Sequence, residues 1–314
     1  MTVAGFTPPA TAAEGVKVTP LGLVKGEFCK FDRAMIFEDP DGTRILYDPG
    51  RTVAGPKDPR LGRIDVILAS HMHGDHVGDK HQPAPNAGSC GEPDLSVSAL
   101  PNTNLINIAL FKDAKIVTGS EMPQFFANKL QALGGDPGNS LLARFGGARQ
   151  IGGVTITTVP AAHSNAVNPA MIGGELGALL SAAGLGAYVG PPTGYVLTFS
   201  NGLSAYLSGD TGITAEQESV VRRHYRAQLV VMNIGDVFTT GPKEAAFVIN
   251  ELVRPNSVIA SHANEVATKD GIVITGSKTD MFIRASRVPV HVPLSEQVMT
   301  FNAHGDCVDG CAKR

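Results

Sequence analysis

Four potential metal ligands lie within six residues, directly after an apolar, β-branched run of the chain: His71, His73, Asp75 and His76. Alternate side chains of an extended segment point the same way, so the first two imidazoles can reach one cation. Gly74 allows the chain to turn between the pairs, so the second pair can reach another cation. A histidine-rich surface loop would explain any one of these residues, but the whole set predicts a metal site.

Three further candidates each follow a predicted strand. Val154–Val159 alternates β-branched apolar residues with threonine, as a half-buried strand does, and leads to His163. Asp210 follows the predicted strand 203–207 within Ser-Gly-Asp-Thr-Gly, where small neighbours allow one carboxylate to approach two cations. His262 ends another apolar run. We expect all three side chains to lie at the same edge as the first cluster.

Two other polar residues have a plausible place near such a site. Asp48 follows the predicted strand 44–47; it is either a simple turn residue or a carboxylate that orients a metal-bound histidine through its free ring N–H. His81 lies in the stretch Lys80–Lys112, which is rich in Gly, Pro, Asn and Ser and which we interpret as an inserted loop bordering the site. We interpret His81 as a loop residue, because the site can be filled without it.

The His-x-His-x-Asp-His pattern at 71–76 resembles the signature of the metallo-β-lactamase superfamily. Gly-Asp-x-Phe-Thr at 235–239, Gly-Pro-Lys-Glu-Ala-Ala at 241–246 and Val-Ile-Ala-Ser-His at 258–262 are similar to its ascorbate-6-phosphate lactonase branch. The resemblance covers about residues 16–301 and implies seven metal ligands. These are His71, His73 and His163 for one ion, Asp75, His76 and His262 for the other, and Asp210 as the bridge.

The resemblance implies a metal-dependent hydrolase with two divalent metal ions. Two adjacent cations lower the pKa of a bridging water, and the hydroxide would attack a carbonyl or phosphoryl group while Asp75 or a metal-bound water handles the proton. Histidine ligands favour zinc, and the carboxylates would also admit manganese or iron. We expect a small-molecule ester, lactone or related acyl substrate. A phosphodiesterase or nuclease and a β-lactam hydrolase are the alternatives; the sequence shows no Arg or Lys cluster near the ligands that would indicate a phosphate pocket.

Strands and helices alternate along the chain, which independently supports a layered α/β fold. The resemblance implies a four-layer αββα sandwich, with two mixed sheets face to face and helices on both outer sides. We expect a flexible N-terminal segment at 1–15, a single hydrolase domain at 16–301 and a C-terminal tail at 302–314. The expected strands include 16–23, 31–38, 44–47, 115–118, 195–199, 203–207 and 229–233, and the expected helices include 122–133 and 214–225.

The most apolar stretch, Asn168–Gly190, begins five residues after His163 and therefore near the predicted metals. It contains Leu179 and Leu180 and several glycines, which would weaken a rigid helix. We hypothesise a mobile apolar lid that favours a substrate with an apolar acyl or aryl group. The alternative is a helical hairpin packed into the core without contact to substrate.

Composition limits the other possibilities. The chain has 314 residues, 43% of them hydrophobic, and a formal net charge of -3 without a basic run, which argues against nucleic acid as an electrostatically bound partner. No stretch reads as a membrane span. Four cysteines fit either two disulfides in an exported protein or free thiols in a cytoplasmic one. We expect an exported, periplasmic protein whose leader is absent from this chain, with a cytoplasmic location as the alternative. The cysteines are Cys29, Cys90, Cys307 and Cys311.

Overall fold

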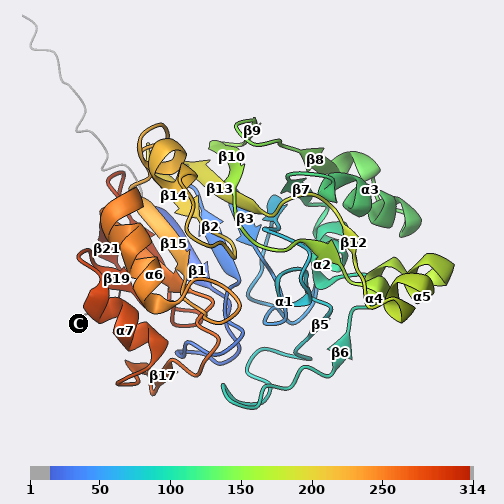
Figure 1. Ribbon diagram of the computed structural model, residues 1–314, viewed down its shortest axis with the longest axis horizontal. Coiled ribbons are helices and arrows are strands. Elements are labelled where there is room, and N and C mark those ends of the chain that lie inside the picture. The colour runs from blue at the N-terminus through green and yellow to red at the C-terminus, as the bar shows by residue number, and fades with distance from the viewer. Residues whose placement is uncertain (1–14, 312–314) are drawn as a thin grey trace, which may run out of the picture.

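Two large mixed β-sheets form the centre of the computed structural model, which describes residues 15–311 (Figure 1). The first sheet contains, in spatial order, β21 (Cys307–Asp309), β20 (Met299–Phe301), β1 (Val16–Pro20), β2 (Met35–Glu38), β3 (Arg44–Tyr47), β4 (Val66–Leu68), β7 (Lys115–Thr118) and β8 (Ser140–Leu142). The second contains β19 (Val290–His291), β16 (Ser257–Ser261), β15 (Leu229–Asn233), β14 (Ser204–Leu207), β13 (Thr193–Thr198), β10 (Val154–Pro160) and β9 (Ala148–Ile151). Each sheet is antiparallel at one end and parallel at the other.

Side chains alternate between two cores along the central strands. In β14, Ala205 and Leu207 belong to the core between the sheets, whereas Tyr206 belongs to the core on the outer face. Ile36 in β2 likewise faces outward, between neighbours that fill the core between the sheets. Both faces of each sheet are therefore apolar, and this accounts for the nearly continuous apolar runs in the sequence.

Helices cover the outer face of each sheet. α2 (Asn104–Lys112) and α3 (Met122–Ala132) pack on the first sheet, and η2 (Gln217–Arg222), α6 (Pro242–Phe247), η3 (Val248–Val253) and α7 (Lys278–Ala285) pack on the second. The other helical segments are α1 (Gly74–Val77), η1 (Pro137–Asn139), α4 (Pro169–Ile172) and α5 (Gly174–Ala182). The small strand pairs are β5 (Lys80–His81) with β6 (Val97–Ser98), β11 (Ala166–Val167) with β12 (Ala187–Tyr188), and β17 (Thr268–Lys269) with β18 (Ile272–Val273). The predicted αββα sandwich is confirmed.

The strand directions bring the predicted ligands to one edge. β3 and β4 are parallel, so the loops after them leave the first sheet on the same side. β10 and β14 both run antiparallel to β13, and β14, β15 and β16 are parallel, so the loops after β10, β14 and β16 also leave on one side. The residues after these strands can therefore meet between the two sheets.

Some expected elements differ in the structure. The stretch Lys80–Lys112 is not only a loop, because it includes β5, β6 and the helix α2, whose Thr103 cap accepts a hydrogen bond from the Ile106 amide at 3.2 Å. The strand expected at 31–38 begins only at residue 35, and the expected tail contains β21, which pairs with β20. The expected N-terminal segment lies outside the described residues, apart from Gly15. Across residues 15–311 no helix is both long and apolar enough to cross a membrane.

Candidate metal centre

The short helix α1 separates the first four predicted ligands into two pairs. The first two histidines lie on the chain after β4, before α1 begins at Gly74. A Cβ atom at residue 74 would lie 2.6 Å from Cγ of Asp79, so a larger residue would disturb this turn. The helical turn then carries Asp75 and His76 into a different group of potential ligands from the preceding pair, as predicted.

His71, His73 and His163 form the first group, in which one ring nitrogen of each lies within 4.8 Å of the others. Nε2 of His71 is 2.9 Å from Nδ1 of His73, and Nε2 of His73 is 3.3 Å from Oγ of Ser164. Burial, together with the neighbouring imidazoles, lowers the pKa of all three histidines. Each ring is therefore neutral at pH 7, which is the state that binds a metal ion.

Asp75, His76 and His262 form the second group, and Asp210 lies between the two groups. Oδ2 of Asp210 is 3.0 Å from Nε2 of His262, 3.2 Å from Nε2 of His76 and 3.9 Å from Nε2 of His163. This is the position expected of a bridging carboxylate. All seven predicted ligands are thus brought together, and their metal binding remains a prediction.

Unsatisfied buried atoms show that this group of residues fits a metal. Within residues 15–311, Nε2 of His76, Nε2 of His262 and Oδ1 of Asp210 are buried without a well-directed hydrogen bond, although Oδ2 of Asp210 lies close to both ring nitrogens. Each such atom costs on the order of 1–3 kcal/mol unless something compensates it. Burial alone would lower the pKa of His76, but the carboxylates of Asp210, Asp48 and Asp75 raise it to about 10. A divalent cation would replace this proton and bind the unpartnered atoms, and the mixed nitrogen and oxygen donors suit zinc, manganese or iron.

Asp48 orients His76 directly and His71 through Ser70, by contacts at the Nδ1 atom of each ring. Its Oδ2 accepts hydrogen bonds from Nδ1 of His76 at 2.8 Å and from Oγ of Ser70 at 2.7 Å, and its Oδ1 accepts one from the Ser70 amide at 2.8 Å. The same Ser70 oxygen lies 2.9 Å from Nδ1 of His71. These contacts leave the Nε2 atoms of both rings directed into the centre. Of the two alternatives for Asp48, the contact with His76 favours the carboxylate that orients a histidine.

Arg33 is a buried cation in the centre that sequence reasoning missed. Its side chain is 2% exposed, and Nη1 donates to the carboxylate of Asp75 and, at 3.2 Å, to its backbone oxygen. Nη2 lies 3.5 Å from Oδ1 of Asn264. Burial would raise the pKa of Asp75, but Arg33 and His76 hold it well below its usual range. Arg33 is far from the ligand motifs in sequence, so only the folded structure places it beside Asp75.

A cavity of about 710 Å³, here called the metal cavity, opens onto the ligands. Besides five of the ligands its wall includes Lys30, Phe31, Arg51, Ser164, Asp236, Phe238 and Asn264. Lys30 and Arg51 both lie against the Phe31 ring, 5.5 and 5.6 Å from its centre. Arg51 also donates two hydrogen bonds, of 2.7 and 2.8 Å, to Asp79, which offsets its charge. These cations were not expected from the sequence.

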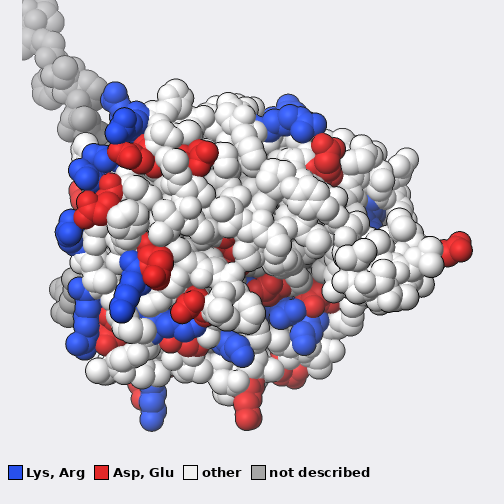
Figure 2. Space-filling model, in the orientation of Figure 1, with Lys and Arg blue, Asp and Glu red and all other residues white. Residues whose placement is uncertain are grey.

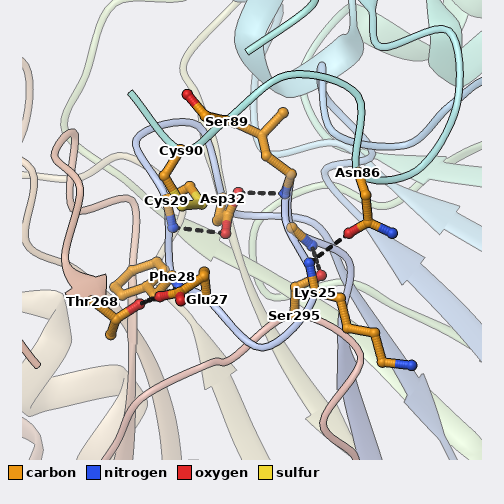
Figure 3. The surroundings of a disulfide bond; sticks show 12 residues. Lys25, Glu27, Phe28, Cys29, Asp32, Asn86, Ser89, Cys90, Thr268 and Ser295 are labelled. Atoms are coloured by element: carbon orange, nitrogen blue, oxygen red, sulfur yellow. Dashed lines mark hydrogen bonds between the residues drawn. A yellow bond between two sulfur atoms is a disulfide. The ribbon is translucent and has the colours of Figure 1, made fainter. Parts of the chain in front are cut away.

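A disulfide anchors the loop that carries Lys30 and Phe31 (Figure 3). Cys29 is bonded to Cys90, which lies in the segment between β5 and β6. Asp32, three residues after the first cysteine, accepts hydrogen bonds from the amides of Leu23 at 2.9 Å and Cys29 at 2.8 Å. Burial raises the pKa of Asp32 to about 6. A second disulfide joins Cys307 to Cys311 near the carboxyl end.

Known proteins resemble this chain in sequence and in fold. A family model described as "Beta-lactamase superfamily domain" matches residues 32–262, a range that includes all seven predicted ligands. A UPF0173 metal-dependent hydrolase of Cupriavidus metallidurans is 30% identical over 240 residues, which cover 71% of this chain and 67% of the relative. Another UPF0173 metal-dependent hydrolase, from Polynucleobacter asymbioticus, is 29% identical over 303 residues, which cover 92% of this chain and 87% of the relative.

Solved structures show the same fold. A metallo hydrolase from the archaeon Ignicoccus hospitalis superposes with a TM-score of 0.59 and 20% sequence identity, and the alignment covers 91% of this chain and 98% of that one. The metallo-beta-lactamase fold protein YhfI of Bacillus subtilis superposes with a TM-score of 0.54 and 13% identity, and the alignment covers 91% of this chain and 100% of that one.

Proposed function

The chain belongs to the beta-lactamase superfamily as a metal-dependent hydrolase, and from that premise we propose that it uses two metal ions to cleave an ester, lactone or related acyl bond. The observation that carries the two-metal proposal is the pair of three-residue groups joined by Asp210. Seven ligand side chains exceed the four that one tetrahedral zinc takes. The ascorbate-6-phosphate lactonase-like branch remains a prediction.

The metal ions, when bound, would supply hydroxide at neutral pH and polarise the scissile bond. The two carboxylates of the centre differ in exposure, because the side chain of Asp75 is 27% exposed at the cavity and that of Asp210 is 4% exposed. Asp75 can therefore accept a hydrogen bond from the attacking water and orient it, with Arg33 holding the carboxylate in place. The buried Asp210 is suited to ligation alone.

The cations of the metal cavity favour phosphodiester cleavage as the second candidate. Lys30 and Arg51 could attract a phosphate, but Asp79 already pairs with Arg51 through both carboxylate oxygens. A phosphate pocket usually offers a free bidentate guanidinium. Acyl hydrolysis therefore remains our first proposal.

A hydrolysis panel tests both candidates. Lactones, aryl esters, bis-aryl phosphodiesters and a chromogenic cephalosporin are incubated with the purified protein, and the metal content of the same sample is measured. We expect turnover of the acyl substrates, and we expect Asp210→Ala to lose it while remaining folded, because the bridging carboxylate sets the distance between the metals. Asp280→Ala, on α7 and outside the wall of the metal cavity, is the control. Selective turnover of the phosphodiester or the cephalosporin would favour the corresponding alternative.

We also propose that the protein works in an oxidising compartment outside the cytoplasm. All four cysteines are paired, and such disulfides persist in secreted and periplasmic proteins. Fractionation of the host cells with thiol labelling tests this, and a cytoplasmic protein with labelled thiols would contradict it.

A further inference from the structure

A second cavity, here called the side pocket, lies beside the metal cavity and has a volume of about 720 Å³. Two chain segments form the boundary between the cavities. Residues 72–74 line the side pocket, while His73 and Asp75 line the metal cavity. In the same way, residues 166–168 line the side pocket, while His163 and Ser164 line the metal cavity. His73 belongs to both walls, so a molecule in the side pocket lies against one of the predicted metal ligands.

The side pocket is suited to an apolar occupant. Among the described residues that line it there is no Lys, Arg, Asp or Glu, and its α4–α5 wall consists mainly of Gly and Ala with Leu185. A Cβ atom at Gly177 would lie 2.7 Å from the oxygen of Pro169, so glycine lets α5 lie close to α4. Figure 2 shows the lobe formed by α4 and α5 as white apart from an acidic side chain at its tip. The volume is within the range of about 300–1,000 Å³ for small-molecule sites.

We propose that the substrate is amphipathic, with an apolar chain in the side pocket and its scissile group beyond His73 in the metal cavity. This inference rests on the proposed function, because it assigns a substrate class to the same centre. The polar residues Lys30, Arg51 and Asn264 then face the polar end of the substrate. Apolar area removed from water supplies the affinity for the chain, and the metal cavity supplies the chemistry.

The structure also identifies which residues of the α4–α5 lobe would determine specificity. Leu176 and Leu179 are 58% and 63% exposed, and neither lines the side pocket. Ala178, Ser181 and Leu185 do line it. Of the two leucines expected to cover the substrate, Leu179 therefore faces solvent, and Leu180 is half-buried without lining the side pocket. Small side chains on the adjacent face of α5 leave the space for the chain.

Adjacent positions on α5 provide a matched pair of variants. Ala178→Trp fills the side pocket, whereas Leu179→Trp adds a bulky ring on the same helix away from it. Calorimetry with sodium butyrate and sodium decanoate measures the effect of chain length with the same carboxylate on metal-loaded protein. Each buried methylene adds up to about fourfold in affinity, so we expect decanoate to bind at least about tenfold more tightly than butyrate to wild type. We expect Leu179→Trp to keep this ratio and Ala178→Trp to lose it.

The same ratio of decanoate to butyrate affinity in all three proteins, or an equal loss of this ratio in both variants, would overturn the inference. If Ala178→Trp does not fold, as judged by circular dichroism, Ser181→Trp takes its place. Hydrolysis of p-nitrophenyl butyrate and decanoate separates this result from the proposed function. Loss of chain preference on filling the pocket, with no ester cleaved, would support the pocket and contradict acyl hydrolysis. Cleavage of both esters at rates that do not depend on chain length, in wild type and in the variants, would support acyl hydrolysis and contradict the pocket.

Discussion

Arg33 binds the carboxylate of Asp75, which is a predicted metal ligand, so we expect this contact to couple stability to metal binding. In the metal-free protein Arg33 is a charge partner of Asp75, and removing it leaves a mostly buried carboxylate without that partner. We expect Arg33→Met to lower the free energy of unfolding of the metal-free protein by on the order of 3 kcal/mol, at the low end for a buried pair because Asp75 is partly exposed. Thermal unfolding with chelator measures this.

The same variant should lose less stability when metal is present, because a cation then compensates Asp75. The difference in Tm between metal-loaded and metal-free protein is therefore expected to be larger in Arg33→Met than in wild type. Arg44→Met, which breaks a more exposed pair with Glu38, is the control and should leave that difference unchanged. An unchanged difference in Arg33→Met would show that Arg33 does not act through Asp75.

Asp32 gives the protein a pH-dependent stability of its own. Its pKa is raised to about 6 from an ordinary value of 3.8, so the folded protein binds the proton more tightly than the unfolded chain. The stability contributed by this group is present below about pH 4 and is lost as the pH rises through about 6. In metal-free protein we expect the stability of Asp32→Asn relative to wild type to increase by about 2 kcal/mol between pH 4 and pH 7, whatever constant offset the lost hydrogen bond adds. Denaturant unfolding across this range measures the difference.

A carboxylate with the opposite pKa shift distinguishes this effect from general charge effects. Asp280 has a lowered pKa, so Asp280→Asn should show no change relative to wild type between pH 5 and pH 8. A flat difference for Asp32→Asn over the same range would mean that Asp32 is already ionised in the folded protein.

At the scale of elements, the two disulfides form a natural comparison. Cys29–Cys90 spans 61 residues of sequence and anchors the loop bearing Lys30 and Phe31, whereas Cys307–Cys311 spans only four. Loop-closure entropy predicts losses of about 4 and about 2 kcal/mol, respectively, when each pair is changed to serine. Only the first change should also raise KM, because it frees one wall of the metal cavity. Chemical denaturation and steady-state kinetics of the two double variants test this, and a similar rise in KM in both would remove the loop from substrate binding.

The elements that the sequence predicted well are those whose signal is local. His71–His76 directly follow an apolar run, and His163, Asp210 and His262 each follow a strand whose residue pattern can be recognised without tertiary information. Arg33 and Lys30 reach the centre only through tertiary contacts and carry no local signal. The helix α2 was missed because its Thr103 cap is preceded by a long stretch rich in glycine and proline. In α5, small and apolar residues occur on every side, so periodicity could not show which face lines a pocket.

At the scale of the whole molecule, the metal centre joins the two sheets. His71, His73, Asp75 and His76 follow a strand of the first sheet, and His163, Asp210 and His262 follow strands of the second. We expect close to two metal ions per chain by elemental analysis. Chelation should abolish hydrolysis, lower Tm and increase hydrogen exchange at the carboxyl ends of β4, β14 and β16, because the metals no longer hold the sheets together. Trace metal in fully active protein, with exchange unaffected by chelator, would contradict this.

The division of the ligands between the sheets also determines when the centre can form during synthesis. His71 leaves the ribosome about 190 residues before His262, an interval of about 10 to 40 s at ordinary rates of elongation. During this time the nascent chain presents an incomplete cluster of histidines that can hold a cation only weakly. If the two-metal proposal is right, the complete centre forms only in the finished chain, and we expect the ions available where folding ends, rather than where translation begins, to determine which metal it binds.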